Sequence, residues 1–181
     1  MNSLDEIRPV WAEINLDNLA NNIREVRRVT NEGTLITAVI KANAYGHGSI
    51  EAAKVFLKNG ADRLAVATLS EAIELRRVNI DVPILILGSI PRNQYNLALK
   101  HDITLTIYNY EDAKVLSEIL EASGKTLNIH IKIDSGMGRI GFLPTDESIS
   151  DIIRISKLPN INIEGIFTHF ATADEKNKEY T

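Results

Sequence analysis

The sequence alternates short runs of β-branched and aliphatic residues with longer stretches whose apolar residues recur at helical spacing. This alternation constrains the fold because parallel strands cannot be joined by tight turns and need a crossover, which is usually a helix. Helical spacing is clear in residues 16–26 and 110–120. The sequence therefore predicts an α/β protein. Its strand-like runs are Trp11–Asn15, Leu35–Ile40, Leu64–Val66, Ile84–Leu87, Ile103–Ile107, Leu127–Ile133 and Ile161–Thr168.

One run favours a barrel over an open, doubly wound sheet. In Asn128–Asp134, isoleucines alternate with polar residues. A central strand of an open parallel sheet is covered by helices on both sides and is apolar on both faces. A barrel strand instead packs one face against helices and can direct polar groups toward the barrel mouth. We therefore expect a (β/α)8 TIM-type barrel.

Local signals support the predicted helices. Thr68-Leu69-Ser70-Glu71 has the pattern of a capping box, in which the two polar side chains bond each other's backbone N–H. Asn109 has the pattern of an N-cap before Tyr110, and Gly124 follows a helical stretch where a left-handed residue commonly ends a helix.

The number of repeats is too small for a complete barrel. A closed barrel needs eight strands and typically about 250 residues, whereas this chain has 181. We interpret residues 1–15 as an N-terminal strand before the barrel, and residues 16–181 as a partial barrel of about six βα units. The segment Asp174–Thr181 is predicted to begin the next helix, so we expect a fragment of a longer protein.

Composition excludes several classes of protein. The formal net charge is −4, so no overall basic field favours nucleic acid or anionic membranes. Cysteine is absent, which removes disulfides, thiolate metal sites and cysteine nucleophiles. No apolar run approaches the roughly 20 residues of a membrane helix, and the first residues do not resemble a secretion signal. We expect a soluble, cytoplasmic protein.

Lys41 is a candidate catalytic residue. It follows an apolar strand, shares the parity of Val39, and precedes a loop of small residues that carries Tyr45 and His47. Barrel enzymes keep their catalytic groups at the carboxyl ends of the strands. A lysine in a low-dielectric site there suits Schiff-base chemistry, because burial favours the neutral amine that attacks a carbonyl. The alternative is a strand-end lysine that extends into solvent.

A glycine-rich stretch carries a second candidate, Arg139. Gly136–Gly141 has the spacing G-x-G-x-x-G directly after a strand. A dinucleotide fingerprint needs these glycines to open a helix, but here the expected helix cap is Thr145 or Asp146. We therefore predict a tight loop that places Arg139 over the barrel mouth, where its fork suits a carboxylate or phenolate oxygen. The alternative is an arginine in a flexible surface loop.

His169 directly follows the last strand-like run, Ile161–Thr168. A histidine there can serve as an acid/base, a metal ligand or a positioning group, or it can be a hydrogen-bonded structural residue. The four histidines show no metal-ligand spacing, so we expect no metal site.

Three stretches together resemble the bacterial alanine racemases, which are pyridoxal-phosphate enzymes. They are Ala38–Gly48, Asp134–Gly141 and Thr168–Asp174, and residues 11–16 are similar to the opening of the family. The resemblance covers nearly the whole chain in order. It implies an N-terminal barrel, a C-terminal β-rich domain that is missing here, and a homodimer with shared active sites.

The resemblance also implies roles for single residues. Lys41 would carry pyridoxal 5'-phosphate covalently and move a proton at the substrate α-carbon, and Tyr45 would contact the cofactor phosphate. Leu87 would pack beside the pyridine ring. Arg139 would bind the phenolic oxygen and the substrate carboxylate, and His169 would orient an arginine that faces the pyridine nitrogen. The lysine that some members carry as a carbamate corresponds to Lys132.

The activity implied is the interconversion of L-alanine and D-alanine, which supplies D-alanine for peptidoglycan. The opposite-face tyrosine would lie beyond Thr181, so we expect this piece to be inactive alone. Three alternatives stay open. They are a non-catalytic pyridoxal-phosphate homeostasis protein, a barrel decarboxylase for basic amino acids, and a racemase of broader specificity.

Overall fold

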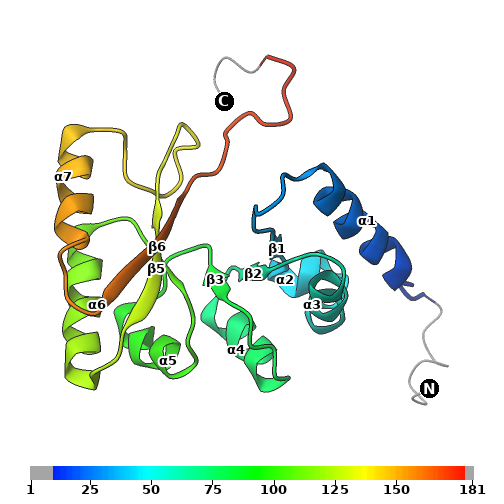
Figure 1. Cartoon of the computed structure of the whole chain (residues 1–181), viewed down its shortest axis with the longest axis horizontal. Coiled ribbons are helices and arrows are strands. Elements are labelled where there is room, and N and C mark those ends of the chain that lie inside the picture. Colours follow the sequence, from blue (N-terminus) through cyan, green and yellow to red (C-terminus); the bar gives the residue numbers. More distant parts are fainter. Residues whose placement is uncertain (1–9, 178–181) are drawn as a thin grey trace.

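Six parallel strands follow one another in sequence order around an open arc (Figure 1). The computed structural model describes residues 10–177. Strands β1 to β3 pair in parallel, as do β4 to β6. A bridge between Leu85 and Thr104 joins the two groups, and the Ile86 N–H donates to the Thr104 carbonyl at 3.0 Å. The strands are β1 (Thr37–Val39), β2 (Arg63–Val66), β3 (Ile84–Ile86), β4 (Leu105–Ile107), β5 (Leu127–Lys132) and β6 (Ile161–Phe167).

This order confirms the predicted barrel topology. A doubly wound sheet reverses its strand order at a switch point, whereas barrel strands add in one direction. The arc is incomplete, with six strands in the described residues against the eight of a closed barrel.

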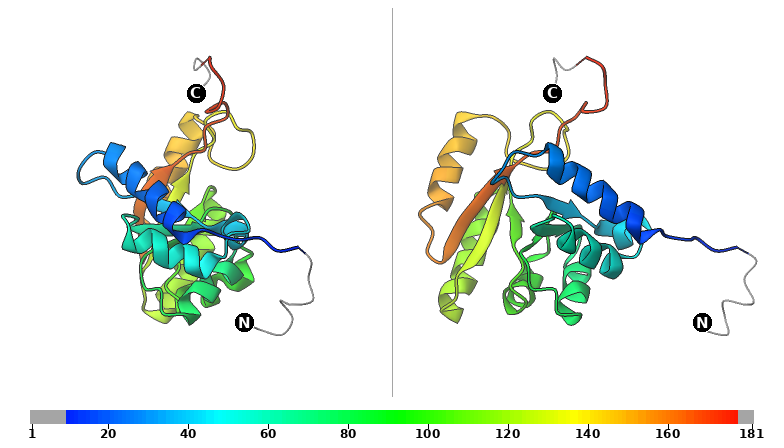
Figure 2. Two further views of the ribbon diagram at one scale, coloured as in Figure 1. Left: turned by 90° about the vertical axis from the view of Figure 1, so that its right-hand side faces the viewer. Right: turned by 45° about the vertical axis from the view of Figure 1, so that its right-hand side comes forward.

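Helices connect the strands along the outside of the arc (Figure 1). Helix α1 runs beside α3, as both views in Figure 2 show. The helices are α1 (Leu16–Val29), α2 (Lys41–Tyr45), α3 (Ser49–Lys58), α4 (Leu69–Arg77), α5 (Tyr95–Lys100), α6 (Tyr110–Ser123) and α7 (Asp146–Ile155), with a 3-10 turn, η1 (Arg92–Gln94), before α5.

The predicted helix signals are confirmed. The Thr68 hydroxyl accepts from the Glu71 N–H, and the Glu71 carboxylate accepts from the Thr68 N–H, which completes the capping box of α4. Asn109 caps α6, and Gly124 ends it in the left-handed conformation.

Strand β5 has one apolar face and one polar face, as its alternating sequence predicts. Ile129 and Ile131 are fully buried, while His130 is only partly buried. Glu164 of β6 pairs with His130 and with Arg63 of β2, so polar side chains from both halves of the arc meet between the strands. The apolar residues of β5 belong to the core cluster, and Ile161 and Ile163 of β6 pack against it, whereas Ile166 of β6 is exposed.

Two sequence-based expectations differ from the structure. Residues 10–15 contain no strand, although the sequence predicts one at Trp11–Asn15, because residues with β propensity form a strand only where a partner strand offers its backbone. Residues 174–176 form a turn and bends instead of the first turn of a helix. The remaining residues of these two predictions, 1–9 and 178–181, lie outside the described part of the chain.

Candidate functional site

A cleft of about 440 Å³ opens at the carboxyl ends of the strands. All six residues singled out from the sequence line it, namely Lys41, Tyr45, Leu87, Lys132, Arg139 and His169. The other lining residues are Val39, Ala67, Gly88, Ile140, Phe167 and Thr168. None of these described lining residues is acidic. The cleft therefore combines an apolar wall with several basic groups, which suits an anionic ligand that carries a ring.

Lys41 stands at the start of a left-handed turn, not in the open loop that the sequence suggests. Residues 42–44 have φ of 51–54° and ψ of 47–50°, and φ of Tyr45 is 54°. The Ala44 N–H bonds the Ile40 carbonyl and the Gly46 N–H bonds the Ala42 carbonyl, as in one helical turn of opposite hand. For residues with a Cβ this conformation costs roughly 1–2 kcal/mol each. Surrounding contacts must therefore hold the turn in place.

Side chains bond both ends of this turn. The Ala42 N–H donates to Oε1 of Glu71 at 2.6 Å. At the far end, Oδ1 of Asn43 accepts from the Ser49 N–H at 2.8 Å, and Nδ1 of His47 lies 2.8 Å from the Ala44 carbonyl oxygen. The turn places the Tyr45 ring centroid 6.0 Å from Nζ of Lys41.

Lys132 is buried in the cleft wall beside an aromatic ring. Its Nζ lies 4.4 Å from the ring centroid of Phe167. Burial lowers the pKa of Lys132 below its usual value, and the charge of Arg139 lowers it further against the opposing effect of Asp134. A lysine with a lowered pKa has a larger neutral fraction and is more nucleophilic.

The glycine-rich loop is organised by one carboxylate, Asp134. Its Oδ1 accepts from the N–H groups of Gly136 and Gly138, and its Oδ2 accepts from the Arg139 N–H at 3.0 Å. These hydrogen bonds hold the pKa of Asp134 below its usual range, and the bond from the Gly138 N–H has the largest effect. The backbone of Arg139 is thus fixed while its side chain stays exposed at the cleft.

The loop does not open a helix. The next helix, α7, begins at Asp146 and is capped by Thr145, which is one of the two caps that the sequence predicts. Phe142 instead folds back and bridges Ile133 next to β5. The glycine spacing therefore builds a support for Arg139, and the dinucleotide interpretation stays rejected.

The last two predicted residues reach the cleft from different elements. Leu87 follows β3 and is partly buried. His169 is exposed and lies in the segment after β6, which projects away from the strands (Figure 2). Their roles toward a cofactor stay predictions.

Two supporting residues were missed from the sequence. Glu71 carries a capping-box signal, but nothing local to it indicates its bond to Ala42, 29 positions earlier. Asp134 belongs to a motif of the resemblance, but no role of its own was predicted for it. An Asp before three closely spaced glycines is a recognisable signal for a carboxylate that accepts hydrogen bonds from several backbone N–H groups of a loop.

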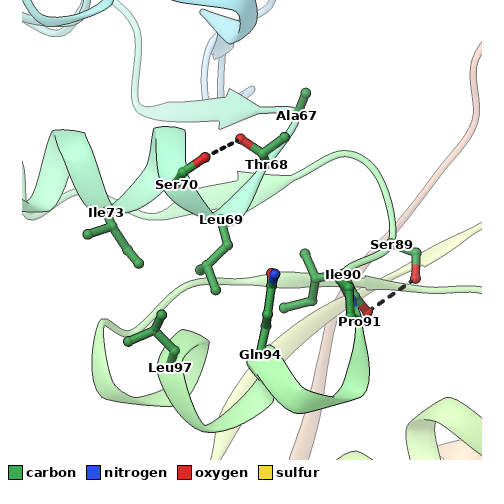
Figure 3. Close-up of a pocket in the computed structure, with 10 residues that line it drawn as sticks. All are labelled: Ala67, Thr68, Leu69, Ser70, Ile73, Ser89, Ile90, Pro91, Gln94 and Leu97. Atoms are coloured by element: carbon green, nitrogen blue, oxygen red, sulfur yellow. Dashed lines mark hydrogen bonds between the residues drawn. The ribbon is translucent and has the colours of Figure 1, made fainter.

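A further cleft has no ionisable lining. A second cleft, of about 410 Å³, lies between α4 and α5 (Figure 3), and its ten lining residues include no ionisable side chain. Within residues 10–177, no group of three acidic or histidine side chains is arranged to hold a metal ion. In the same part of the chain, no helix has both the length and the apolar composition needed to cross a bilayer.

Fold and site together define a class. This is a parallel α/β barrel domain with a lysine at the end of its first strand, and with an arginine and a histidine at the ends of later strands, all facing one cleft.

Comparison with known proteins makes the assignment more specific. The family described as alanine racemase, N-terminal domain, matches residues 14–181, and the chain belongs to this family. The alanine racemase of Clostridium tetani is 55% identical over 97% of the chain and 45% of that protein. A solved alanine racemase of Clostridium difficile superposes with a TM-score of 0.92 at 50% identity, over 96% of the chain and 48% of that structure. The chain thus spans less than half the length of these relatives.

A more distant relative is named as a racemase of a different amino acid, histidine. The histidine racemase of Leuconostoc mesenteroides superposes with a TM-score of 0.80 at 33% identity, over 91% of the chain and 43% of that structure.

Proposed function

We propose that this chain is the cofactor-holding barrel portion of a pyridoxal-phosphate-dependent alanine racemase, an isomerase that interconverts L-alanine and D-alanine and supplies D-alanine for peptidoglycan. One observation carries the proposal. Lys41, Lys132 and Arg139 line a single cleft that also has apolar lining residues and, among the described residues, no acidic one. An anionic phosphate and a phenolate oxygen attached to a flat ring match this lining.

Each lining residue has a task in this proposal. The Lys41 amine would hold the cofactor covalently and would move a proton at the substrate α-carbon. Tyr45 binds the phosphate, Leu87 packs against the ring, and Arg139 binds the phenolic oxygen and the substrate carboxylate. His169 orients a further arginine near the ring nitrogen. The cofactor itself supplies delocalisation of the carbanion.

Racemisation needs a second acid/base on the opposite face of the α-carbon, because the proton must leave one face and return on the other. We propose that a tyrosine of the partner supplies it in a homodimer with shared active sites. The chain by itself is therefore expected to form no D-alanine from L-alanine when pyridoxal phosphate is added. Sustained turnover by the isolated chain would contradict this expectation.

Covalent labelling tests the central assignment. Pyridoxal phosphate should give the protein a visible absorbance, and reduction with borohydride should fix the added mass on Lys41. Lys41→Ala should abolish both signals. Lys125→Ala is the matched control, because Lys125 is exposed and lies just before β5, at the end of the strands away from the cleft. Labelling at another lysine, or an unchanged signal in Lys41→Ala, would refute the proposal.

We further propose that Lys132 reacts with carbon dioxide, giving a carbamate and releasing a proton. Its lowered pKa provides the neutral amine, and the adjacent charge of Arg139 would stabilise the new anion. Nuclear magnetic resonance after incubation with ¹³C-bicarbonate should show a carbamate signal that Lys132→Gln removes. A spectrum without this signal in the wild-type protein would exclude the modification.

The relatives described above carry racemase names, which favours a racemase over a homeostasis protein or a decarboxylase. The histidine racemase leaves a broader specificity as the second candidate. A panel of L-amino acids offered to a full-length subunit decides between them. Alanine should be racemised fastest if the proposal is correct.

A further inference from the structure

One carboxylate joins the turn after Lys41 to the neighbouring loop of the cleft. Oε1 of Glu71 accepts from the Ala42 N–H at 2.6 Å. Oε2 accepts from the Ala67 N–H at 2.8 Å and from the Thr68 N–H at 3.0 Å. The two oxygens thus bind two separate segments, and Ala67 itself lines the cleft.

The Ala42 bond comes where the strained backbone begins. The bonds of Asn43 and His47 are made within residues 43–49 and secure the far end of the turn. At the Lys41 end, Glu71 reaches in from another helix, α4. A left-handed turn of residues with a Cβ persists only where its surroundings determine it.

The electrostatics of Glu71 favour this arrangement. Burial raises the pKa of Glu71, but the N–H groups of Ala42, Ala67 and Thr68 outweigh it and lower the pKa below its usual value. The group is therefore an ionised carboxylate near neutral pH, with one oxygen available to each segment.

We propose that Glu71 is a positioning residue for Lys41, which holds the left-handed turn so that the lysine amine and the Tyr45 ring keep their places in the cleft. The proposal rests on the proposed function of Lys41. It gives Glu71 a task beyond capping α4, because capping uses only the oxygen bound to Thr68.

Glu71→Gln separates the two tasks. A glutamine has one acceptor oxygen, and glutamine also serves in a capping box. Its oxygen can keep the bonds to Ala67 and Thr68, but its amide then faces the Ala42 N–H, and two donors cannot bond each other. The variant therefore keeps the cap of α4 and loses the bond to the turn.

Two control variants separate positioning from stability. Thr68→Ala removes the capping hydroxyl of α4 and leaves the Glu71 carboxylate and the Ala42 N–H in place. Glu74→Gln removes the same charge from an exposed position of the same helix.

The first measurement is amide hydrogen exchange at Ala42, which needs no cofactor. Glu71→Gln should speed exchange by about tenfold or more, because a hydrogen bond to a charged group is lost. Thr68→Ala and Glu74→Gln should exchange as the wild type does. Unchanged exchange in Glu71→Gln would overturn the proposal whether or not the protein binds pyridoxal phosphate.

The second measurement uses the full-length holoenzyme. Glu71→Gln should lower kcat by up to about 100-fold with a smaller change in KM, since misplaced reacting groups slow the chemical step. It should also shift the visible absorbance of the bound cofactor. Thr68→Ala should lower the thermal midpoint while leaving kcat and the spectrum unchanged.

Equal effects of the two variants on kcat would show a structural role only and overturn the proposal. A wild-type protein that binds no pyridoxal phosphate would instead refute the proposed function, and the exchange result would still decide on the turn.

Discussion

At the scale of single residues, Gly141 shows why the glycine loop has its sequence. Its φ is 136°, and a Cβ there would lie 2.3 Å from the Asp134 nitrogen and 2.6 Å from the Ile133 carbonyl carbon. Both atoms are backbone, so they cannot move aside as a flexible side chain could. The glycine therefore allows the loop to fold back against the end of β5 beneath Arg139.

Gly141→Ala should consequently destabilise the protein by roughly 3 kcal/mol or more, since overpacking adds to backbone strain. Gly138→Ala is the matched control. Gly138 has a φ of 68° and open space around the Cβ position, so only the conformational cost of roughly 1–2 kcal/mol applies. Urea unfolding of both variants measures the difference. Equal losses would show that the close approach at Gly141 is not the cause.

Residues that act through local patterns were predictable, and residues that act over a distance were not. Lys41, Arg139 and His169 were found because each lies at or after the end of a strand-like run, and the topology brings such ends together. The contact of Glu71 with Ala42 depends on the spacing between β1 and β2, which no local pattern records.

At the scale of elements, the helices and the later strands were predictable while the turn at Lys41–Tyr45 was not. Caps and apolar spacing are local, so the caps Thr68 and Asn109 were predictable and the cap of α7 was narrowed to Thr145 or Asp146. The sequence at Lys41–Tyr45 is Lys-Ala-Asn-Ala-Tyr, and nothing in it favours a left-handed helix over a loop. Tertiary contacts determine that conformation.

One arginine of helix α1, Arg27, makes several hydrogen bonds to other segments. Nε and Nη2 of Arg27 donate to the Gly60 carbonyl at 3.1 and 2.7 Å, and Nη1 donates to the Thr34 carbonyl at 2.7 Å. Arg27 also pairs with Asp62. The pKa of Asp62 is lowered mainly by the hydrogen bond from the Ile36 N–H, and Arg27 lowers it further. One side chain thus joins α1 to the segment before β1 and to the segment before β2.

Arg27→Ala should therefore lower the free energy of unfolding by roughly 1.5–3 kcal/mol, the range for hydrogen bonds to charged groups. Arg28→Ala tests the neighbouring position. Its pair with Glu25 is exposed and should contribute at most about 1 kcal/mol. Chemical denaturation measures both variants, and a similar loss in the two would contradict the proposed anchoring.

At the scale of the whole molecule, a polar network ties the two halves of the arc together. Oε2 of Glu164 on β6 lies 2.8 Å from Nη1 of Arg63 on β2 and 3.1 Å from Nε2 of His130 on β5. A Cβ on Gly165 would lie 2.8 Å from Cε1 of His130, so the glycine leaves room for the ring. These strands belong to two groups that are joined where β3 meets β4, and the network adds a further connection between them.

Because of this network, the free energy of unfolding should decrease as the pH falls into the acid range. Burial raises the pKa of Glu164, but its hydrogen bonds to His130 and Arg63 and their charges outweigh this and lower it. A carboxyl group whose pKa is lowered by folding contributes stability that is fully present above its unfolded pKa, about 4.3, and is lost as the pH falls through its folded pKa.

Glu164→Gln leaves Arg63 unpaired, so the variant should be less stable than the wild type at neutral pH, and the two should converge in acid. Glu118→Gln, at an exposed position of α6, should follow the wild-type curve. Urea unfolding from pH 7 down to acid tests this, and parallel curves for the wild type and Glu164→Gln would show that Glu164 does not link the two halves of the arc.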